Sequence, residues 1–293
     1  MKNILKRLIP FLCIFIFIFL CSCNGTSNDT DTNTNTDTDN KINEPITPAN
    51  VEILKIGKAD CIIINTGSKL VMIDTGEEED VSTITTYMRL NNYDKIDVLI
   101  LTHYDKDHIG GASEVISRYN VETIIESKFD DSTLEYIYYH SAMYDKDQTP
   151  LKLAQNYKFT FDSCEFEINV PQKNKYTEKK DNNTSLIVSV KCGDTNLLFA
   201  GDAMEERLEE FIKDNQTAYD FIKLPYHGIY LDNYREFLDS TKPKYGAVTD
   251  SSKNPTETAT INILNEFNVT LYQTRYGKIT VTTDGEKITI KQN

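Results

Sequence analysis

Two histidines and two aspartates lie within six consecutive positions of one segment, as His103, Asp105, Asp107 and His108. The segment follows the apolar run 98–101, which predicts a buried strand that ends where these residues begin. Imidazole nitrogens and carboxylate oxygens are common ligands of zinc and other divalent cations. If His103 and Asp105 face one side of the loop and Asp107 and His108 the other, this one loop could serve two adjacent cations.

Two further ligand types follow later strands in the same manner. Asp202 comes after Gly201 and the predicted strand 197–200, where a carboxylate at a strand end can bridge two cations. His227 follows the short predicted strand 221–224. The fourth histidine, His140, lies in an aromatic-rich predicted helix without a neighbouring carboxylate or glycine turn, so we expect it to pack or to lie on the helix surface.

The elements that must position these residues alternate between strand and helix periodicity. Helical spacing is expected at 81–90, 112–119, 134–143, 204–214 and 256–267. Strands are expected at 51–56, 61–65, 70–74, 96–101, 157–161, 164–170, 186–190, 197–200, 221–224, 270–273, 279–283 and 287–290. Two rounds of strands followed by helices predict a four-layered α/β sandwich whose ligand loops meet at one edge, with the last three strands completing the second sheet.

The N-terminal residues predict export. Three cations, Lys2, Lys6 and Arg7, precede the apolar run 8–21, which has the length of a signal-peptide core and is shorter than the ~20 residues of a spanning helix. Leu20-Cys21-Ser22-Cys23 resembles a bacterial lipobox, so Cys23 is the expected lipidation site on the outer face of a membrane. The alternative is an ordinary signal peptide with a secreted product.

The expected organisation is a signal peptide at 1–22, a tether at 23–50 and one domain at 51–293. The tether is rich in Asn, Thr, Asp and Ser, which cannot offset the entropy of ordering. The net charge of −14 argues against a stable nucleic-acid complex, although it does not exclude transient cleavage. Beyond the tether, Cys61, Cys164 and Cys192 contain no close-set pair, so at most one disulfide can form within the domain.

In order and spacing, the motifs between residues 51 and 290 resemble the metallo-β-lactamase fold. The likeness is strongest to standalone relatives of the hydrolase domain of ComEC-type DNA-uptake channels. The matching segments are Gly57-Lys58-Ala59-Asp60, Asp74-Thr75-Gly76, the loop 102–111, Asn182-Asn183-Thr184-Ser185-Leu186, Gly201-Asp202 and Tyr226-His227-Gly228. The resemblance implies an αββα sandwich with a metal centre at one edge.

The resemblance also implies a ligand set. One cation would take His103, Asp105 and the bridging Asp202, with Asn182 or water, and the other would take Asp107, His108, Asp202 and His227. Asp105 stands where the broad superfamily has histidine, as in the ComEC-like branch, and the histidine that usually completes the first site is absent. Zinc is the expected metal, and the oxygen-rich first site also suits manganese or iron. Asp74 is expected to order the loop rather than to bind metal.

The activity that this resemblance implies is metal-assisted hydrolysis, with a metal-bound hydroxide as the nucleophile and a phosphodiester as the first candidate substrate. Asp107 and Asp202 would be catalytic through the metals. Tyr226 either donates a proton to the leaving group or only packs beside His227. Two alternatives are hydrolysis of another ester, a lactone or a β-lactam, and a non-catalytic surface protein that keeps a metal and binds a ligand.

Overall fold

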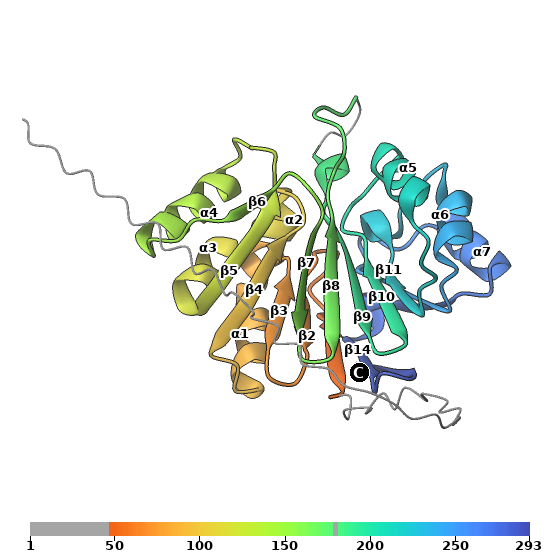
Figure 1. The fold of residues 1–293 in the computed structure, drawn as a ribbon, viewed down its shortest axis with the longest axis horizontal. Helices are drawn as coiled ribbons and strands as arrows, with labels where there is room; N and C mark the ends of the chain where they lie inside the picture. Colours follow the sequence, from red (N-terminus) through yellow and green to blue (C-terminus); the bar gives the residue numbers. More distant parts are fainter. Residues whose placement is uncertain (1–46, 178–180) are drawn as a thin grey trace, which may run out of the picture. The chain divides into compact units, whose positions relative to one another are not determined.

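Strand pairing divides the domain into two facing sheets (Figure 1). The computed structural model describes residues 47–293 except 178–180, and these belong to one compact unit, Asn43–Asn293. The signal peptide, Cys23 and most of the tether lie outside the described residues. Within the described part, no helix is long and apolar enough to cross a membrane.

The first sheet has eight strands in the order β15-β14-β1-β2-β3-β4-β5-β6. Their bounds are β1 Ala49–Ile53, β2 Ile62–Asn65, β3 Leu70–Ile73, β4 Lys95–Leu101, β5 Asn120–Ser127, β6 Leu151–Leu153, β14 Ile279–Thr283 and β15 Ile288–Gln292. The second sheet has seven strands in the order β13-β12-β11-β10-β9-β8-β7. Their bounds are β7 Tyr157–Phe161, β8 Cys164–Asn169, β9 Ile187–Cys192, β10 Thr195–Phe199, β11 Phe221–Lys223, β12 Tyr245–Val248 and β13 Thr270–Gln273.

Helices cover the outer face of each sheet, which makes four layers (Figure 1). Their bounds are α1 Val81–Leu90, α2 Lys106–Ile109, α3 Ala112–Arg118, α4 Leu134–Asp145, α5 Glu205–Asp214, α6 Tyr234–Thr241 and α7 Thr258–Glu266. Ile73, Ile100 and Phe199 belong to the central core between the sheets, because alternate strand residues point inward. Two outer clusters pack the helices against the sheets, so the predicted four-layered sandwich is confirmed.

The last two strands correct one prediction. They were expected in the second sheet, whereas β14 pairs antiparallel with β1, Val51 opposite Val281, and β15 pairs with β14, both in the first sheet. Their alternating apolar residues suit the edge of either sheet, so the pattern alone did not determine the partner. The first strand begins at Ala49, which is two residues before the predicted start of the domain.

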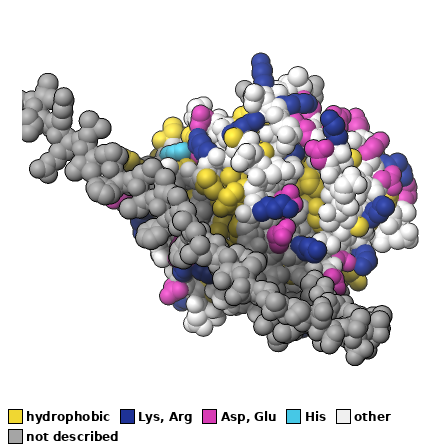
Figure 2. All heavy atoms as spheres, viewed as in Figure 1, with side chains coloured by type: hydrophobic (Ala, Val, Ile, Leu, Met, Phe, Trp, Pro, Cys, Tyr) yellow, Lys and Arg dark blue, Asp and Glu magenta, His cyan; other side chains and the backbone are white. Residues whose placement is uncertain are grey.

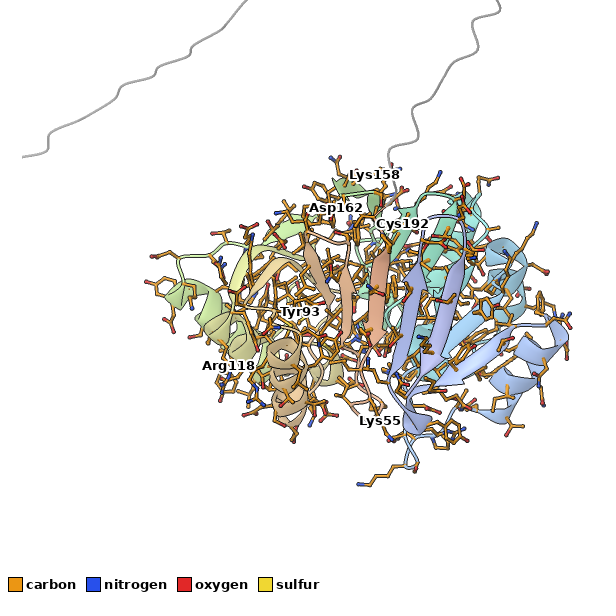
Figure 3. All side chains as sticks on the ribbon, turned by 90° about the horizontal axis from the view of Figure 1, so that it is seen from below. Lys55, Tyr93, Arg118, Lys158, Asp162 and Cys192 are labelled. Atoms are coloured by element: carbon orange, nitrogen blue, oxygen red, sulfur yellow. A yellow bond between two sulfur atoms is a disulfide. The ribbon has the colours of Figure 1, made fainter. Side chains whose placement is uncertain are left out.

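The ligand-bearing loops follow the carboxyl ends of parallel strand pairs, β3 with β4 and β10 with β11. These ends form one edge of the sandwich, where open α/β sheets commonly bind ligands. At the opposite end lie Asp162 and Cys192, far from Lys55, which follows β1 (Figure 3). A disulfide joins Cys164 to Cys192 there, within the predicted limit of one bond, and Cys61 is a buried free thiol.

Candidate active site

The ligand loop begins where β4 ends and turns at once into the short helix α2. Asp105 has an extended backbone, and α2 starts at Lys106. His103, Asp107 and His108 are buried, and the two imidazole rings lie 4.1 Å apart between centroids. The side chain of Asp105 is 39% exposed. A strand end followed by a tight helical turn therefore brings both histidines into one buried cluster.

Asp74 orders this loop, as expected from sequence. One of its carboxylate oxygens accepts a hydrogen bond from the Thr102 amide at 2.8 Å, and the other accepts from the Thr102 hydroxyl at 2.7 Å. The same second oxygen lies 2.7 Å from His108 Nδ1. Because the Thr102 hydroxyl proton goes to Asp74, its oxygen accepts from His103 Nδ1 at 3.1 Å. In the neutral form of each ring, as a metal ligand requires, the lone pair is then on Nε2 and faces the site.

Asp202 lies between two histidines. Its Oδ1 is 3.3 Å from His108 Nε2, and its Oδ2 is 2.9 Å from His227 Nε2. His227 Nε2 is also 3.3 Å from Asp107 Oδ2. His227 and Tyr226 both have left-handed backbone conformations, with φ of 51° and 48°. Such strain in residues other than glycine clusters at functional sites, and here it directs the imidazole toward Asp202.

Several buried atoms of this cluster make no hydrogen bond within the described residues. They are the Nε2 atoms of His103, His108 and His227 and Oδ1 of Asp202. Buried polar atoms without partners are costly, so a cluster of them calls for a ligand. Two overlapping groups, His103 with His108 and Asp202, and Asp107 with His108 and His227, each offer three ligand atoms within 4.8 Å of one another. The donor set therefore fits divalent cations.

Three other predicted site residues lie around this centre. Asp105 Oδ2 is 3.6 Å from His103 Nε2. Asn182 is buried in the short helical turn Asn182–Thr184. The ring of Tyr226 lies 6.4 Å from that of His227 between centroids. Their assignment as metal ligands or as a proton donor stays a prediction. His140 contacts the rings of Tyr136 and Tyr139 in α4, which agrees with the packing role expected for it.

Sequence reasoning gave no role to two lysines beside the ligands. Lys58 Nζ is 2.6 Å from Asp107 Oδ2. Lys223, fully buried in β11, forms an ion pair with Asp60, and its Nζ lies 3.8 Å from Asp202 Oδ1. A lysine inside an otherwise apolar strand is almost never buried without a partner. That rule was the one signal that could have placed Lys223 beside carboxylates.

The charges of the cluster shift the pKa values of its members. Burial alone would lower the pKa of His108, yet Asp202 and Asp74 raise it well above its usual value. Burial would raise the pKa of Asp202, yet His227 and His108 hold it well below its usual range. Asp107 is likewise shifted down, against burial, by His227, His108 and Lys58. The carboxylates are therefore ionised at neutral pH, as metal ligands must be.

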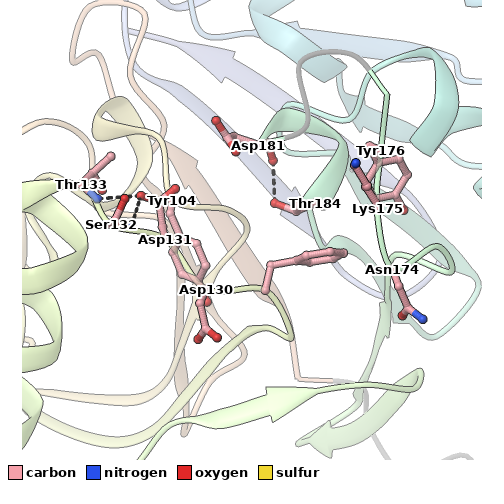
Figure 4. Close-up of a pocket in the computed structure, with 11 residues that line it drawn as sticks. Tyr104, Asp130, Asp131, Ser132, Thr133, Asn174, Lys175, Tyr176, Asp181 and Thr184 are labelled. Carbon is pink, nitrogen blue, oxygen red and sulfur yellow. Dashed lines mark hydrogen bonds between the residues drawn. The ribbon is translucent and has the colours of Figure 1, made fainter.

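Two hollows adjoin the site. One, of about 700 Å³, opens between the loop after β5 and the segment before Asn182 (Figure 4). Its lining is Tyr104, Phe129, Asp130, Asp131, Ser132, Thr133, Asn174, Lys175, Tyr176, Asp181 and Thr184. The other, of about 500 Å³, is lined by Ile56, Gly57, Lys58, Glu77, Glu79, Asp80, Ser251, Ser252, Lys253 and Asn254. Tyr104, which follows His103, lines the first hollow, and Lys58, which contacts Asp107, lines the second.

A profile of the metallo-β-lactamase superfamily matches residues 55–248, well over half of the chain. The chain belongs to the metallo-β-lactamase superfamily. This match contains the ligand loop, Asp202 and His227. A 74-residue stretch is also 30% identical to a metal-dependent hydrolase of Cupriavidus metallidurans, over 25% of each chain.

Competence proteins are among its relatives. The chain is 23% identical over 223 residues to competence protein ComA of Neisseria gonorrhoeae, covering 73% of this chain and 29% of that protein. It is 24% identical over 218 residues to recombination protein 2 of Haemophilus influenzae, covering 70% and 24%. The chain thus spans less than a third of the length of either relative. These matches agree with the expected likeness to the ComEC-like branch.

Solved structures share the fold. The metallo-β-lactamase fold protein YhfI of Bacillus subtilis aligns with a TM-score of 0.52 at 12% identity, covering 77% of this chain and 96% of that one. CmlA, a diiron β-hydroxylase from Streptomyces venezuelae, aligns with a TM-score of 0.53 at 13% identity, covering 79% and 53%. At these identities the likeness establishes the architecture and leaves the substrate to the site itself.

Proposed function

We propose that this protein is a membrane-anchored, extracellular phosphodiesterase or nuclease with two divalent cations at the edge of the sandwich. The observation that carries the proposal is the convergence of buried ligand atoms without hydrogen-bond partners around Asp202. Zinc suits the imidazole-rich ligand set, and manganese or iron suits the position of Asp105 and Asn182. Such cations would polarise a phosphoryl oxygen and supply hydroxide at neutral pH.

The chain's own residues would orient the reaction. Asp202, placed between His108 and His227, is the candidate bridge between the two cations. Once Asp107 binds metal, the ammonium of Lys58 becomes available to an anionic oxygen of the substrate at the mouth of the site. Tyr226 is the candidate proton donor to the leaving group.

The two hollows support a diester rather than a monoester. A phosphodiester carries one substituent on each side of phosphorus, and one hollow is lined by Tyr104, next to His103, while the other is lined by Lys58, which contacts Asp107. Figure 2 shows Lys and Arg side chains interspersed with Asp and Glu over the visible face. A surface of mixed charge and a net charge of −14 suit brief contact with a polyanion rather than a stable nucleic-acid complex.

Two features support an exported, anchored domain. The chain enters at Thr47, whose carbonyl accepts a hydrogen bond from Ser163 at the end of the sandwich opposite the ligand loops. A tether that joins the domain at this end would leave the ligand loops open to substrates outside the cell. The disulfide between Cys164 and Cys192 suits an oxidising compartment.

A different ester or a lactone is the second candidate, favoured by the larger hollow. Three carboxylates, Asp130, Asp131 and Asp181, line it beside one ammonium, Lys175. This excess of negative charge in the hollow favours an uncharged or cationic substituent over an extended polyanion. The two candidates differ in the bond that is cleaved and share the metal centre.

The test is hydrolysis of bis(p-nitrophenyl) phosphate, p-nitrophenyl phosphate, p-nitrophenyl acetate and a simple lactone by the zinc- or manganese-loaded protein. We expect the diester to be preferred, and Asp202→Ala to lower its kcat/KM roughly a thousand-fold. Asp239→Ala, on the exposed face of α6, is the matched control and should leave the rate unchanged. Preference for the lactone or carboxylic ester would select the second candidate, and no turnover of any probe would favour a ligand-binding protein.

A further inference from the structure

A chain of buried polar contacts leads away from His227. His227 Nδ1 lies 3.0 Å from the hydroxyl of Thr249, which follows β12, and this hydroxyl lies 2.5 Å from Asp60 Oδ1. The other oxygen of Asp60 pairs with the ammonium of Lys223. All four side chains are at most 7% exposed. The contacts therefore form one buried relay from the metal cluster to an internal ion pair.

Hydrogen-bond chemistry fixes the direction of this relay. A carboxylate only accepts, so the single hydroxyl proton of Thr249 goes to Asp60. The hydroxyl oxygen is then left as an acceptor, and His227 must donate to it through Nδ1–H. In the neutral ring this places the lone pair of His227 on Nε2, the atom that faces Asp202 and Asp107.

Lys223 and Thr249 together occupy both oxygens of Asp60. Both oxygens of Asp60 are therefore occupied by protein partners, although Asp60 also forms a group of possible ligand atoms with Asp74 and His108. Lys223 also donates to the Gly201 carbonyl at 3.3 Å, immediately before Asp202. The Asp60 amide donates to the Asp107 carbonyl at 3.0 Å, so its backbone is tied to the ligand loop as well.

We propose that Asp60 is a positioning residue for His227, acting through Thr249, with Lys223 as its internal counter-charge. The arrangement repeats that of Asp74, Thr102 and His103 on the other side of the cluster. His103 and His227 thus each have a threonine and a carboxylate behind Nδ1, and Asp74 also contacts His108 directly. This inference rests on the metal centre of the proposed function and adds which residues orient His227 toward it.

The experiment titrates the metal-free full-length protein with cobalt(II), following the visible absorption bands and the heat of binding. Thr249→Val keeps the shape of the side chain and removes the relay. We expect it to weaken one of two cobalt sites about 10- to 100-fold and to leave the other within about twofold. Thr249→Ser keeps the hydroxyl and should restore wild-type affinity within about threefold. Thr102→Val is the mirror control and should weaken the other site instead.

A second readout does not depend on metal. In ¹⁵N-histidine-labelled protein, the Nδ1 proton of His227 should give a downfield, exchange-protected signal in wild type and in Thr249→Ser. Thr249→Val should lose that signal while the Nδ1 signal of His108, bonded to Asp74, persists. The signal of His227 is assigned by its disappearance in His227→Gln.

Four results would overturn the inference: a Thr249→Val variant with wild-type cobalt binding, equal weakening of both sites, failure of Thr249→Ser to restore affinity, or no Nδ1 signal from His227 in wild type. Absence of cobalt binding by wild-type protein contradicts the proposed function instead. In that case the Nδ1 signal still decides whether Asp60 and Thr249 orient His227.

Discussion

Loss of the disulfide between Cys164 and Cys192 is expected to destabilise the domain by about 3.5 kcal/mol. The bond joins residues 28 positions apart at paired sites of β8 and β9. In the chain-entropy account, closing a loop of this length restricts the unfolded chain by about that amount. Both cysteines are fully buried in the central core, so the native packing around them can persist after reduction. The effect should therefore appear mainly as a shift of the unfolding equilibrium.

Urea unfolding of the full-length protein, with and without a phosphine reductant, measures this effect. With an m-value of about 2.5 kcal/mol per molar urea, the midpoint should fall by roughly 1.4 M on reduction. The double variant Cys164→Ala with Cys192→Ala is the control, and its midpoint should not respond to the reductant. A wild-type midpoint that is unchanged on reduction, or alkylation of Cys164 in the unreduced protein, would refute the reasoning.

Two further predictions concern named carboxylates. Burial opposes ionisation of Asp97, yet Lys69, Lys95 and the Leu70 amide lower its pKa to about 2. The ionised side chain therefore stabilises the fold above about pH 4, and this contribution is lost as the pH falls toward 2. At pH 7, Asp97→Asn should lower the free energy of unfolding by about 1 kcal/mol after solvent screening, and the loss should shrink as the pH falls toward 2. An equal loss at both pH values would contradict this pH dependence. Asp74→Asn should weaken cation binding 10- to 100-fold, because the orientation of His108 and His103 depends on Asp74. Competition with a chelator measures the affinity, and an unchanged affinity would exclude this role of Asp74.

Much of the site could be predicted because its ligands are local in sequence. His103, Asp107 and His108 share one loop, and the apolar strand before it fixes where that loop lies. Asp202 and His227 likewise follow β10 and β11 directly. Once parallel strands are assumed, the ends of these strands meet at one edge without any knowledge of distant contacts. Helix α1 was predicted to the residue for a similar reason, since its periodicity is complete within itself.

The remainder depends on long-range partners that no local pattern encodes. Asp60 and Thr249 are 189 residues apart, and only the packing of the two sheets brings them together. Strand β12, which precedes Thr249, has four residues and was not predicted, because so short an apolar run is ambiguous between strand and other structure. β5 was also missed, since polar residues alternate irregularly through its first half. The pairing of β14 with β1 joins the two ends of the domain sequence, and no local pattern in either strand specifies that partner.

The most direct test of the proposed centre is the metal stoichiometry of the full-length protein. It is determined by elemental analysis after loading with zinc or manganese and removal of free ion. The account predicts two cations per wild-type chain and at most one in Asp202→Ala, with Asp239→Ala unchanged, because Asp202 lies between His108 and His227. A wild-type chain that retains no cation would contradict the account.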